Sequence, residues 1–222
     1  MADVRVPLTD LIAPPFYSVH HDLKAGRHAE YWLKGGRGST KSSFASVEII
    51  LGMIADPDAN AIVYRKIADT LRESVYAQML WAIDKLGVRQ YFRAKVAPME
   101  IIYIPTGQRI MFRGADDPGK SKSIKLREGY FKYLWFEELT EFAGADDLRT
   151  IKASIIRGGG KAYTLCSYNP PISQRNWVNT ESLVARADRM VHQSCYTDVP
   201  RDWLGSAFIS EAEALRDTND KA

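Results

Sequence analysis

Eight consecutive residues, 35–42 (GGRGSTKS), are of the types that bind the phosphates of a nucleotide. Glycines let backbone N–H groups approach phosphate oxygens closely and accept unusual φ angles. Lys41 would neutralise β- and γ-phosphate oxygens, the Ser42 hydroxyl would ligate Mg²⁺, and a helix starting here would point its positive dipole end at the phosphates. The spacing predicts a P-loop for ATP and Mg²⁺, with phosphate contacts from Gly35, Gly36, Arg37, Gly38, Ser39, Thr40, Lys41 and Ser42.

One position departs from the general P-loop pattern, because Thr40 stands where a second glycine is expected. A β-branched residue does not easily take a positive φ. We therefore expect either a right-handed conformation at Thr40 or a tight bend displaced to Gly38. A glycine-rich turn with a surface lysine is the structural alternative to nucleotide binding.

Two adjacent carboxylates, Glu137 and Glu138, end the apolar run YLWF. Such a run predicts a buried parallel strand, and open α/β sheets place ligands at the carboxyl ends of their strands. Successive strand residues point to opposite sides, so the two acids should differ in role. We expect Glu137 to hold the Mg²⁺ shell through water and Glu138 to polarise the attacking water. Two surface glutamates are the alternative.

Two further groups of residues could contact the nucleotide. Ser167 and Asn169 leave a predicted strand at residues 162–166, where a small polar side chain could contact the γ-phosphate or the attacking water. Phe16 and Tyr17 precede the P-loop strand, where an aromatic ring could stack on adenine. The alternatives are a strand end set by the Asn-Pro pair and a plug for the sheet edge.

The pattern of apolar residues predicts an α/β fold with a mostly parallel central sheet flanked by helices. Residues 1–30 read as an irregular lead-in. Strands are expected at residues 29–34, 61–65, 133–138 and 162–166, and helices at residues 41–55, 70–86 and 208–215. Residues 95–104 and 109–112 read as an inserted β-hairpin, followed by a polar loop at residues 113–125.

Composition is that of an ordinary globular chain: 222 residues, 45% hydrophobic, with a net charge of +3. The charge is uneven, because residues 61–130 hold thirteen Lys and Arg against seven Asp and Glu, an excess of +6. That excess favours a polyanionic partner such as DNA, with a solvated helix face as the alternative. No apolar run is long enough to span a membrane and no signal peptide is evident, so a cytosolic location is expected. The two cysteines and four histidines form no metal-binding spacing.

Taken together, GGRGSTKS, LWFEE, the Arg157-Gly158-Gly159 turn and SYNPP followed by Trp177 resemble the ATPase domain of the large terminase subunit of tailed bacteriophages. The resemblance covers about residues 10–210. P-loops of that family accept a non-glycine residue before the lysine and often contain an arginine, so Thr40 and Arg37 fit them. The family implies a P-loop NTPase of the additional-strand (RecA-like) type.

The resemblance also implies partners and a location. A ring of identical subunits would push double-stranded DNA into a procapsid through its portal, with a small terminase subunit helping to select the DNA, all in the host cytoplasm. We expect a lead-in at 1–30 that could cover the adenine site, an ATPase core at 31–195, and a segment at 196–222 leading towards a ribonuclease H-like domain. Nuclease activity is not expected in these 222 residues.

Hydrolysis in ring motors needs an arginine that meets the charge of the transition state. Arg37 could act within its own subunit. Arg127 precedes the acidic strand and could reach a neighbour's nucleotide, and Arg157 is expected near the nucleotide edge. We favour Arg127. A helicase or RecA-like ATPase of other DNA metabolism, and a module in which ATP is only a structural ligand, are the alternative functions.

Overall fold

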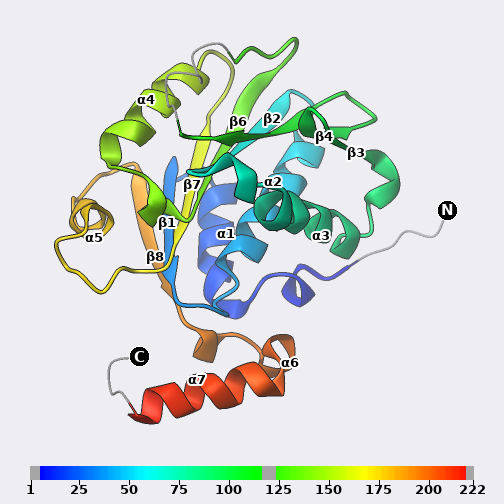
Figure 1. Ribbon diagram of the computed structural model, residues 1–222. Coiled ribbons are helices and arrows are strands. Elements are labelled where there is room, and N and C mark those ends of the chain that lie inside the picture. The colour runs from blue at the N-terminus through cyan, green and yellow to red at the C-terminus, as the bar shows by residue number, and fades with distance from the viewer. Residues whose placement is uncertain (1–5, 117–123, 219–222) are drawn as a thin grey trace.

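A single eight-stranded sheet forms the centre of the molecule (Figure 1). The structure is a computed structural model, and it describes residues 6–116 and 124–218. The strands lie in the order β3-β4-β5-β2-β6-β7-β1-β8. Five neighbouring pairs are parallel, and the two pairs β3–β4 and β4–β5 are antiparallel. The predicted mostly parallel α/β sheet is confirmed. The strands are β1 (Glu30–Gly35), β2 (Ala59–Arg65), β3 (Phe92–Val96), β4 (Met99–Tyr103), β5 (Arg109–Gly114), β6 (Tyr130–Glu137), β7 (Tyr163–Tyr168) and β8 (Arg189–Ser194).

Helices cover the two faces of this sheet unequally. One face packs on α1, α2 and α3, and the other on α4 and α5. Two helices, α6 and α7, lie below the sheet in the view of Figure 1. The helices are α1 (Tyr17–Lys24), α2 (Lys41–Ala55), α3 (Ala77–Lys85), α4 (Ala145–Ile155), α5 (Trp177–Ser182), α6 (Arg201–Leu204) and α7 (Ser206–Thr218), and the 3-10 turns are η1 (Leu8–Asp10), η2 (Pro14–Phe16), η3 (Ala68–Thr70), η5 (Arg89–Tyr91), η7 (Leu139–Glu141) and η8 (Tyr196–Asp198).

The strand side chains alternate between the two apolar layers. In β1, Tyr31 and Leu33 pack into the layer shared with α1 to α3, whereas Trp32 packs into the layer shared with α4 and α5. This is the period of two that a pleated strand imposes. Apolar side chains point to both faces, so β1 is buried on both sides.

The position of β7 defines the type of fold. It lies between β1, which leads into the P-loop, and β6, which carries the two acids. A strand inserted between these two is the additional strand that was predicted. It also brings the carboxyl ends of three strands with polar side chains to one edge.

The irregular structure predicted for residues 1–30 is wrong, because residues 17–24 form helix α1. The segment YSVHHDLK contains few strong helix formers. Its Val19 and Leu23 are buried against the sheet, and this packing stabilises a helix that propensity alone would not predict.

The predicted strand at residues 95–104 is also wrong. Val96 ends β3 and Met99 begins β4, with Ala97 and Pro98 forming a turn between them. The inserted hairpin is therefore part of a three-stranded antiparallel unit whose last strand, β5, pairs in parallel with β2. Residues 117–123 of the predicted loop lie outside the described residues.

Two other predicted elements need smaller corrections. The helix expected at 70–86 is helical but includes a π-helical stretch, η4 (Arg72–Tyr76), before α3. The strand expected at residues 162–166 continues to Tyr168, so Ser167 lies inside β7. The predicted helices at 41–55 and 208–215 correspond to α2 and α7.

Candidate active site

The carboxyl ends of β1, β6 and β7 meet at one edge of the sheet, and the predicted P-loop and acid residues gather there. Lys34 of β1 lies opposite Tyr168 of β7, and Glu137 of β6 lies opposite Ser167 of β7. The register therefore brings together strands that are far apart in the sequence. The first residue of α2 is Lys41, so this helix directs its positive end at the same edge.

The P-loop bends twice into the left-handed region. Gly38 has φ +75° and Thr40 has φ +59°. The expectation that Thr40 would be right-handed, or that Gly38 alone would make the bend, is thus wrong. A threonine in this region stores backbone strain of about 1–3 kcal/mol, which the surrounding structure must offset. Within the described residues, the Thr40 hydroxyl is buried and lacks a hydrogen-bond partner.

Lys41 is held by four oxygen atoms. Its Nζ donates to the carbonyl oxygens of Gly35 (2.7 Å) and Gly36 (3.1 Å), to Ser39 Oγ (3.1 Å) and to Asn169 Oδ1 (3.0 Å). The residue is only 8% exposed. Burial lowers the pKa of Lys41, and the carboxylates of Glu137 and Glu138 oppose that shift. Asn169 therefore lies beside the P-loop lysine, and its contact with the nucleotide stays a prediction.

Glu137 is fixed by two hydroxyl groups. Ser42 Oγ donates to Glu137 Oε1 (2.6 Å), and Ser167 Oγ donates to Glu137 Oε2. Ser167 in turn accepts a hydrogen bond from Trp135 Nε1 at 2.7 Å. Burial raises the pKa of Glu137, while the hydrogen bonds from Ser167 and Ser42 act against that rise. The hydroxyl of Ser167 is thus engaged with the acid, which makes Ser167 a positioning residue for Glu137.

Glu138 occupies a strained position at the end of β6. Its φ of +54° and ψ of +57° are left-handed, and its carbonyl oxygen accepts from the Glu141 backbone N–H at 2.9 Å. Among the described residues, Glu138 and Thr40 are the two non-glycine residues with positive φ. Strain of this kind concentrates at functional sites. Glu138 also influences the pKa of Lys41, so its carboxylate lies near the P-loop.

The oxygen groups beside Lys41 fit a bound Mg²⁺. Mg²⁺ in phosphoryl-transfer sites keeps several waters and takes only one or two protein oxygens. Ser42 Oγ and Glu137 Oε1 offer such a pair side by side. No cluster of three or more His, Cys, Asp or Glu side chains suited to a metal occurs within residues 6–116 and 124–218.

The three candidate arginines lie at opposite edges of the sheet. Arg37 is exposed on the P-loop itself. Arg127 precedes the amino end of β6, which at 3.3 Å per residue puts it roughly 23 Å or more from the acids. Arg157 follows α4 and precedes β7, and the neighbouring Gly159 approaches Tyr130 at the amino end of β6. The expectation that Arg157 lies near the nucleotide edge is therefore wrong, because α4 returns the chain to the other end of the sheet.

Phe16 and Tyr17 do not share one environment. Phe16 is fully buried and its ring stacks on Phe44 of α2 with centroids 4.6 Å apart. Tyr17 is partly buried and packs against the same core. This placement favours the plugging role over adenine stacking for Phe16, because its ring is fully buried against α2.

Arg65 lies beside the site, although the sequence pattern marks it only as the end of a strand. It ends β2 next to β6, and its Nη2 donates to Glu141 Oε1 at 2.9 Å. Glu141 belongs to the turn that follows Glu138, so this ion pair ties the acid loop to the sheet. The signal for Arg65 in the sequence is a basic residue at the end of the apolar run 61–65, where a parallel strand meets the site edge of the sheet.

The chain after β8 returns to the P-loop. A Cβ added to Gly38 would lie 2.6 Å from Phe208 of α7 and 3.4 Å from Leu204 of α6. Close by, a cavity of about 390 Å³ is lined by residues of η1, the start of α2, α3 and α6: Asp10, Leu11, Thr40, Ser43, Trp81, Lys85, Asp202 and Trp203. The cavity therefore opens beside the first turn of the P-loop helix.

Comparisons with known proteins agree with this geometry. A sequence model of the family described as "Phage terminase large subunit" matches residues 27–222. The large terminase subunit of Bacillus phage SPP1 is 37% identical over 222 residues, covering 97% of this chain and 52% of that protein. The PBSX phage terminase large subunit of Bacillus subtilis is 29% identical over 146 residues, covering 66% of this chain and 32% of that protein. The chain thus spans about half, or less, of the length of these relatives.

Solved structures show the same fold at low identity. The large terminase of a thermophilic bacteriophage has a TM-score of 0.70 at 13% identity, covering 90% of this chain and 49% of its own. A structure of the same thermophilic phage protein in complex with ATP-gamma-S has a TM-score of 0.68 at 13% identity, covering 90% and 48%. The N-terminal domain of the DNA packaging ATPase of bacteriophage phi29 has a TM-score of 0.56 at 13% identity, covering 84% and 96%. The additional-strand P-loop fold is confirmed.

Proposed function

This chain belongs to the phage terminase large subunit family, and from that membership we propose that it is the ATP-hydrolysing motor domain that drives DNA packaging. The observation that carries the proposal is the arrangement of Lys41, Ser42 and Glu137 at the carboxyl edge of the sheet. In the working motor, the domain acts in a homo-oligomeric ring with double-stranded DNA, a small terminase subunit and the portal of a procapsid. Among the described residues, none of the helices is long and apolar enough to cross a bilayer.

Each residue of the site has a separate task in hydrolysis. The P-loop backbone and Lys41 bind the β- and γ-phosphates, and Asn169 holds the lysine beside them. Ser42 and Glu137 hold Mg²⁺, which when bound neutralises charge on the β- and γ-phosphate oxygens. Glu138 takes the proton of the attacking water, since it follows Glu137 at the end of β6 and its charge acts on Lys41. Ser167 fixes Glu137 by donating a hydrogen bond to its carboxylate.

We propose the cavity beside Thr40 and Ser43 as the base site for ATP. A nucleotide whose phosphates lie along the P-loop can extend its base past the first turn of α2 into this cavity. Trp203, which is 37% exposed, offers an indole face for stacking on the purine. Leu11 contributes from the lead-in, which supports the expectation that residues 1–30 help to cover the adenine site.

Replacing Trp203 with Ala is expected to weaken ATP binding by about 5- to 150-fold, because base–aromatic stacking contributes about 1–3 kcal/mol. Titration with a fluorescent ATP analogue gives the affinity. Tyr17→Leu, which removes the other candidate ring but keeps apolar packing, should leave the affinity within about twofold of wild type. If Tyr17→Leu weakens binding and Trp203→Ala does not, the base lies over the lead-in instead.

We propose that Arg127 acts on the nucleotide of a neighbouring subunit. Its distance from its own P-loop, set by the length of β6, leaves action in trans as its only route to a nucleotide. Arg37, exposed on the P-loop, is the candidate for action within the same subunit. The ring arrangement required by Arg127 puts the amino edge of one sheet against the carboxyl edge of the next.

Arg127→Ala is expected to lower hydrolysis in the assembled motor by about 10³-fold while ATP binding is retained. Mixed rings provide the sharper measurement: Lys41→Ala subunits still carry Arg127, so mixing them with Arg127→Ala subunits should restore part of the phosphate release. Arg157→Ala, an exposed arginine near the same edge, is the matched control and should turn over normally. Full turnover by Arg127→Ala rings, or mixed rings as inactive as either parent, would exclude the role in trans.

A further inference from the structure

The antiparallel strands β3, β4 and β5 have two chemically different faces. Phe92, Ile101 and Ile110 point to the layer that contains α3. The opposite face carries a row formed by Arg93, Ile102 and Arg109, which the register places side by side across the three strands. In the next row, Lys95 of β3 lies opposite Glu100 of β4. One face is thus apolar and the other mainly basic.

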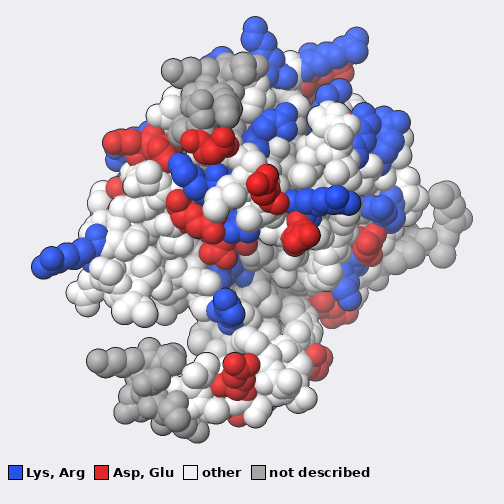
Figure 2. Space-filling view, viewed as in Figure 1, with Lys and Arg blue, Asp and Glu red and all other residues white. Residues whose placement is uncertain are grey.

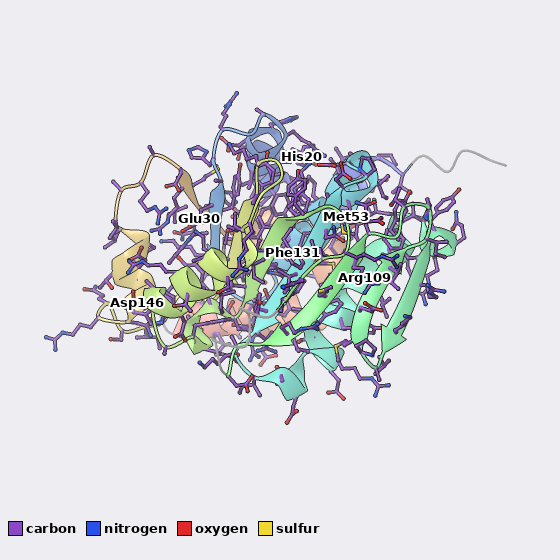
Figure 3. All side chains as sticks on the ribbon, turned by 90° about the horizontal axis from the view of Figure 1, so that it is seen from above. His20, Glu30, Met53, Arg109, Phe131 and Asp146 are labelled. Carbon is purple, nitrogen blue, oxygen red and sulfur yellow. The ribbon has the colours of Figure 1, made fainter. Side chains whose placement is uncertain are left out.

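No helix of the described chain covers the face that carries Arg93, Ile102 and Arg109. Figure 3, seen from above, shows α4 over the other half of the sheet, while Arg109 and the strands β3 to β5 have only side chains in front of them. Ile102 on this face is nevertheless only 7% exposed. Its neighbours in the row are two arginines, a residue type whose aliphatic stem can cover apolar surface while its charged end stays in water.

The charges on this face do not cancel. Glu100 is 5% exposed and pairs with Lys95 (3.1 Å) and Arg109 (3.4 Å), so one buried carboxylate faces two outer cations. Arg93 is exposed and forms no ion pair with another described residue. Figure 2 shows Lys and Arg side chains gathered at the upper right, where Figure 1 places β3 and β4. We define the basic face as Arg93, Lys95 and Arg109.

We propose that the basic face contacts the phosphate backbone of duplex DNA during translocation. This inference rests on the proposed motor function and adds the surface that grips the substrate. Arg93 and Arg109 are two strand spacings apart, which is about 10 Å. Duplex DNA carries a negative charge every ~1.7 Å of its axis, so a rigid row of cations finds phosphates at any register along it. Contacts to phosphates do not read sequence, as a packaging motor requires.

Two simpler roles for the basic face account for only part of it. Charged residues on an edge strand prevent pairing with another sheet. That role accounts for Arg93 and Lys95 on β3, but not for Arg109 on the interior strand β5. A docked protein partner would require an apolar centre, whereas the one apolar side chain in the Arg93–Arg109 row is already covered.

The test measures how DNA affinity depends on salt, using fluorescence anisotropy of a labelled duplex of about 30 base pairs. Arg93→Ala alone should reduce the magnitude of the negative slope of log K against log salt by about 0.9, because one phosphate contact is lost. The combined variant R93A, K95A, R109A should lower it by up to about 2.7, and should weaken binding at about 50 mM salt at least tenfold. Glu100→Gln is added to the combined variant so that no buried carboxylate is left unpaired.

The matched control removes three exposed cations elsewhere, in the variant K24A, R27A, R149A, and should change the slope by less than about 0.5. Equal slopes for wild type and the basic-face variants, equal losses in the control, or no duplex binding by wild type at low salt would each overturn the inference. A change in oligomeric state with unchanged DNA affinity would assign the face to a protein contact and would also overturn it. Nucleotide affinity separates this failure from failure of the proposed function, since the basic-face variants should bind ATP normally and Lys41→Ala should not.

Discussion

Glu138→Gln is expected to bind ATP with an affinity within about threefold of wild type and to hydrolyse it about 10²- to 10⁴-fold more slowly. The size of the loss is that of a general base removed from its reaction. Glutamine keeps the shape of the side chain but cannot accept the proton of the attacking water. Phosphate release should be measured in a ring preparation in which wild type turns over, with ATP affinity measured on the same samples.

Glu141→Gln is the matched control for this experiment. It changes a second carboxylate in the same loop, three residues later, and weakens only the ion pair with Arg65. We expect its turnover to fall less than about tenfold. If Glu138→Gln hydrolyses ATP normally, another group is the base. If wild-type rings bind ATP but never release phosphate, the chain is a nucleotide-gated module and not a motor.

Lys41→Ala is expected to lose at least about 100-fold in nucleotide affinity. The P-loop holds this ammonium group at the carboxyl edge, and charge-assisted hydrogen bonds to phosphates contribute about 1.5–3 kcal/mol each. Losing about 3 kcal/mol corresponds to roughly a 150-fold higher Kd. Titration calorimetry with ATP and Mg²⁺ measures this directly.

Thr40→Gly separates loss of the ammonium group from damage to the loop. Glycine accepts the φ of +59° at this position without strain. The variant should therefore fold as stably as wild type or more so, and should bind ATP within about threefold of wild type. If Thr40→Gly binds as poorly as Lys41→Ala, the loop conformation and not the Lys41 charge limits the affinity.

The sequence was sufficient to predict the elements that bear the chemistry. The P-loop and the strand before it are marked by residue types and a spacing typical of a phosphate-binding site, and Glu137 and Glu138 follow an apolar run that is buried in the sheet. Parallel strands place their carboxyl ends at one edge, so the meeting of these residues with Asn169 also followed from the pattern.

The conformation of single residues could not be predicted in the same way. Thr40 adopts a backbone conformation that its own side chain disfavours, because the surrounding loop and α2 determine it. For Ser167, the sequence predicts a contact with the γ-phosphate or the attacking water, which stays a prediction. It does not predict that β7 continues two residues further than the apolar pattern, or that the Ser167 hydroxyl donates to Glu137. Both outcomes depend on neighbours that are distant in sequence.

The sequence also does not show at which edge of the sheet, amino or carboxyl, a given loop lies. Arg127 and Arg157 both lie in glycine-containing loops close in sequence to site residues. Whether such a loop is at the amino or carboxyl edge depends on which segments are crossover helices, and α4 has a polar sequence with few apolar markers. Only the structure shows that its Leu148, Ile151 and Ile155 pack against the sheet.

The position of β1 between β7 and β8 affects how the chain acquires its structure. β1 is the first strand to be synthesised, yet both of its partners lie near the end of the fold. Until residues 163–168 and 189–194 leave the ribosome, β1 is an apolar strand with two unpaired edges. Such strands are prone to aggregate. The nucleotide site consequently cannot form before β7 is available to join β1 to β6, so ATP can stabilise only a chain that has folded that far.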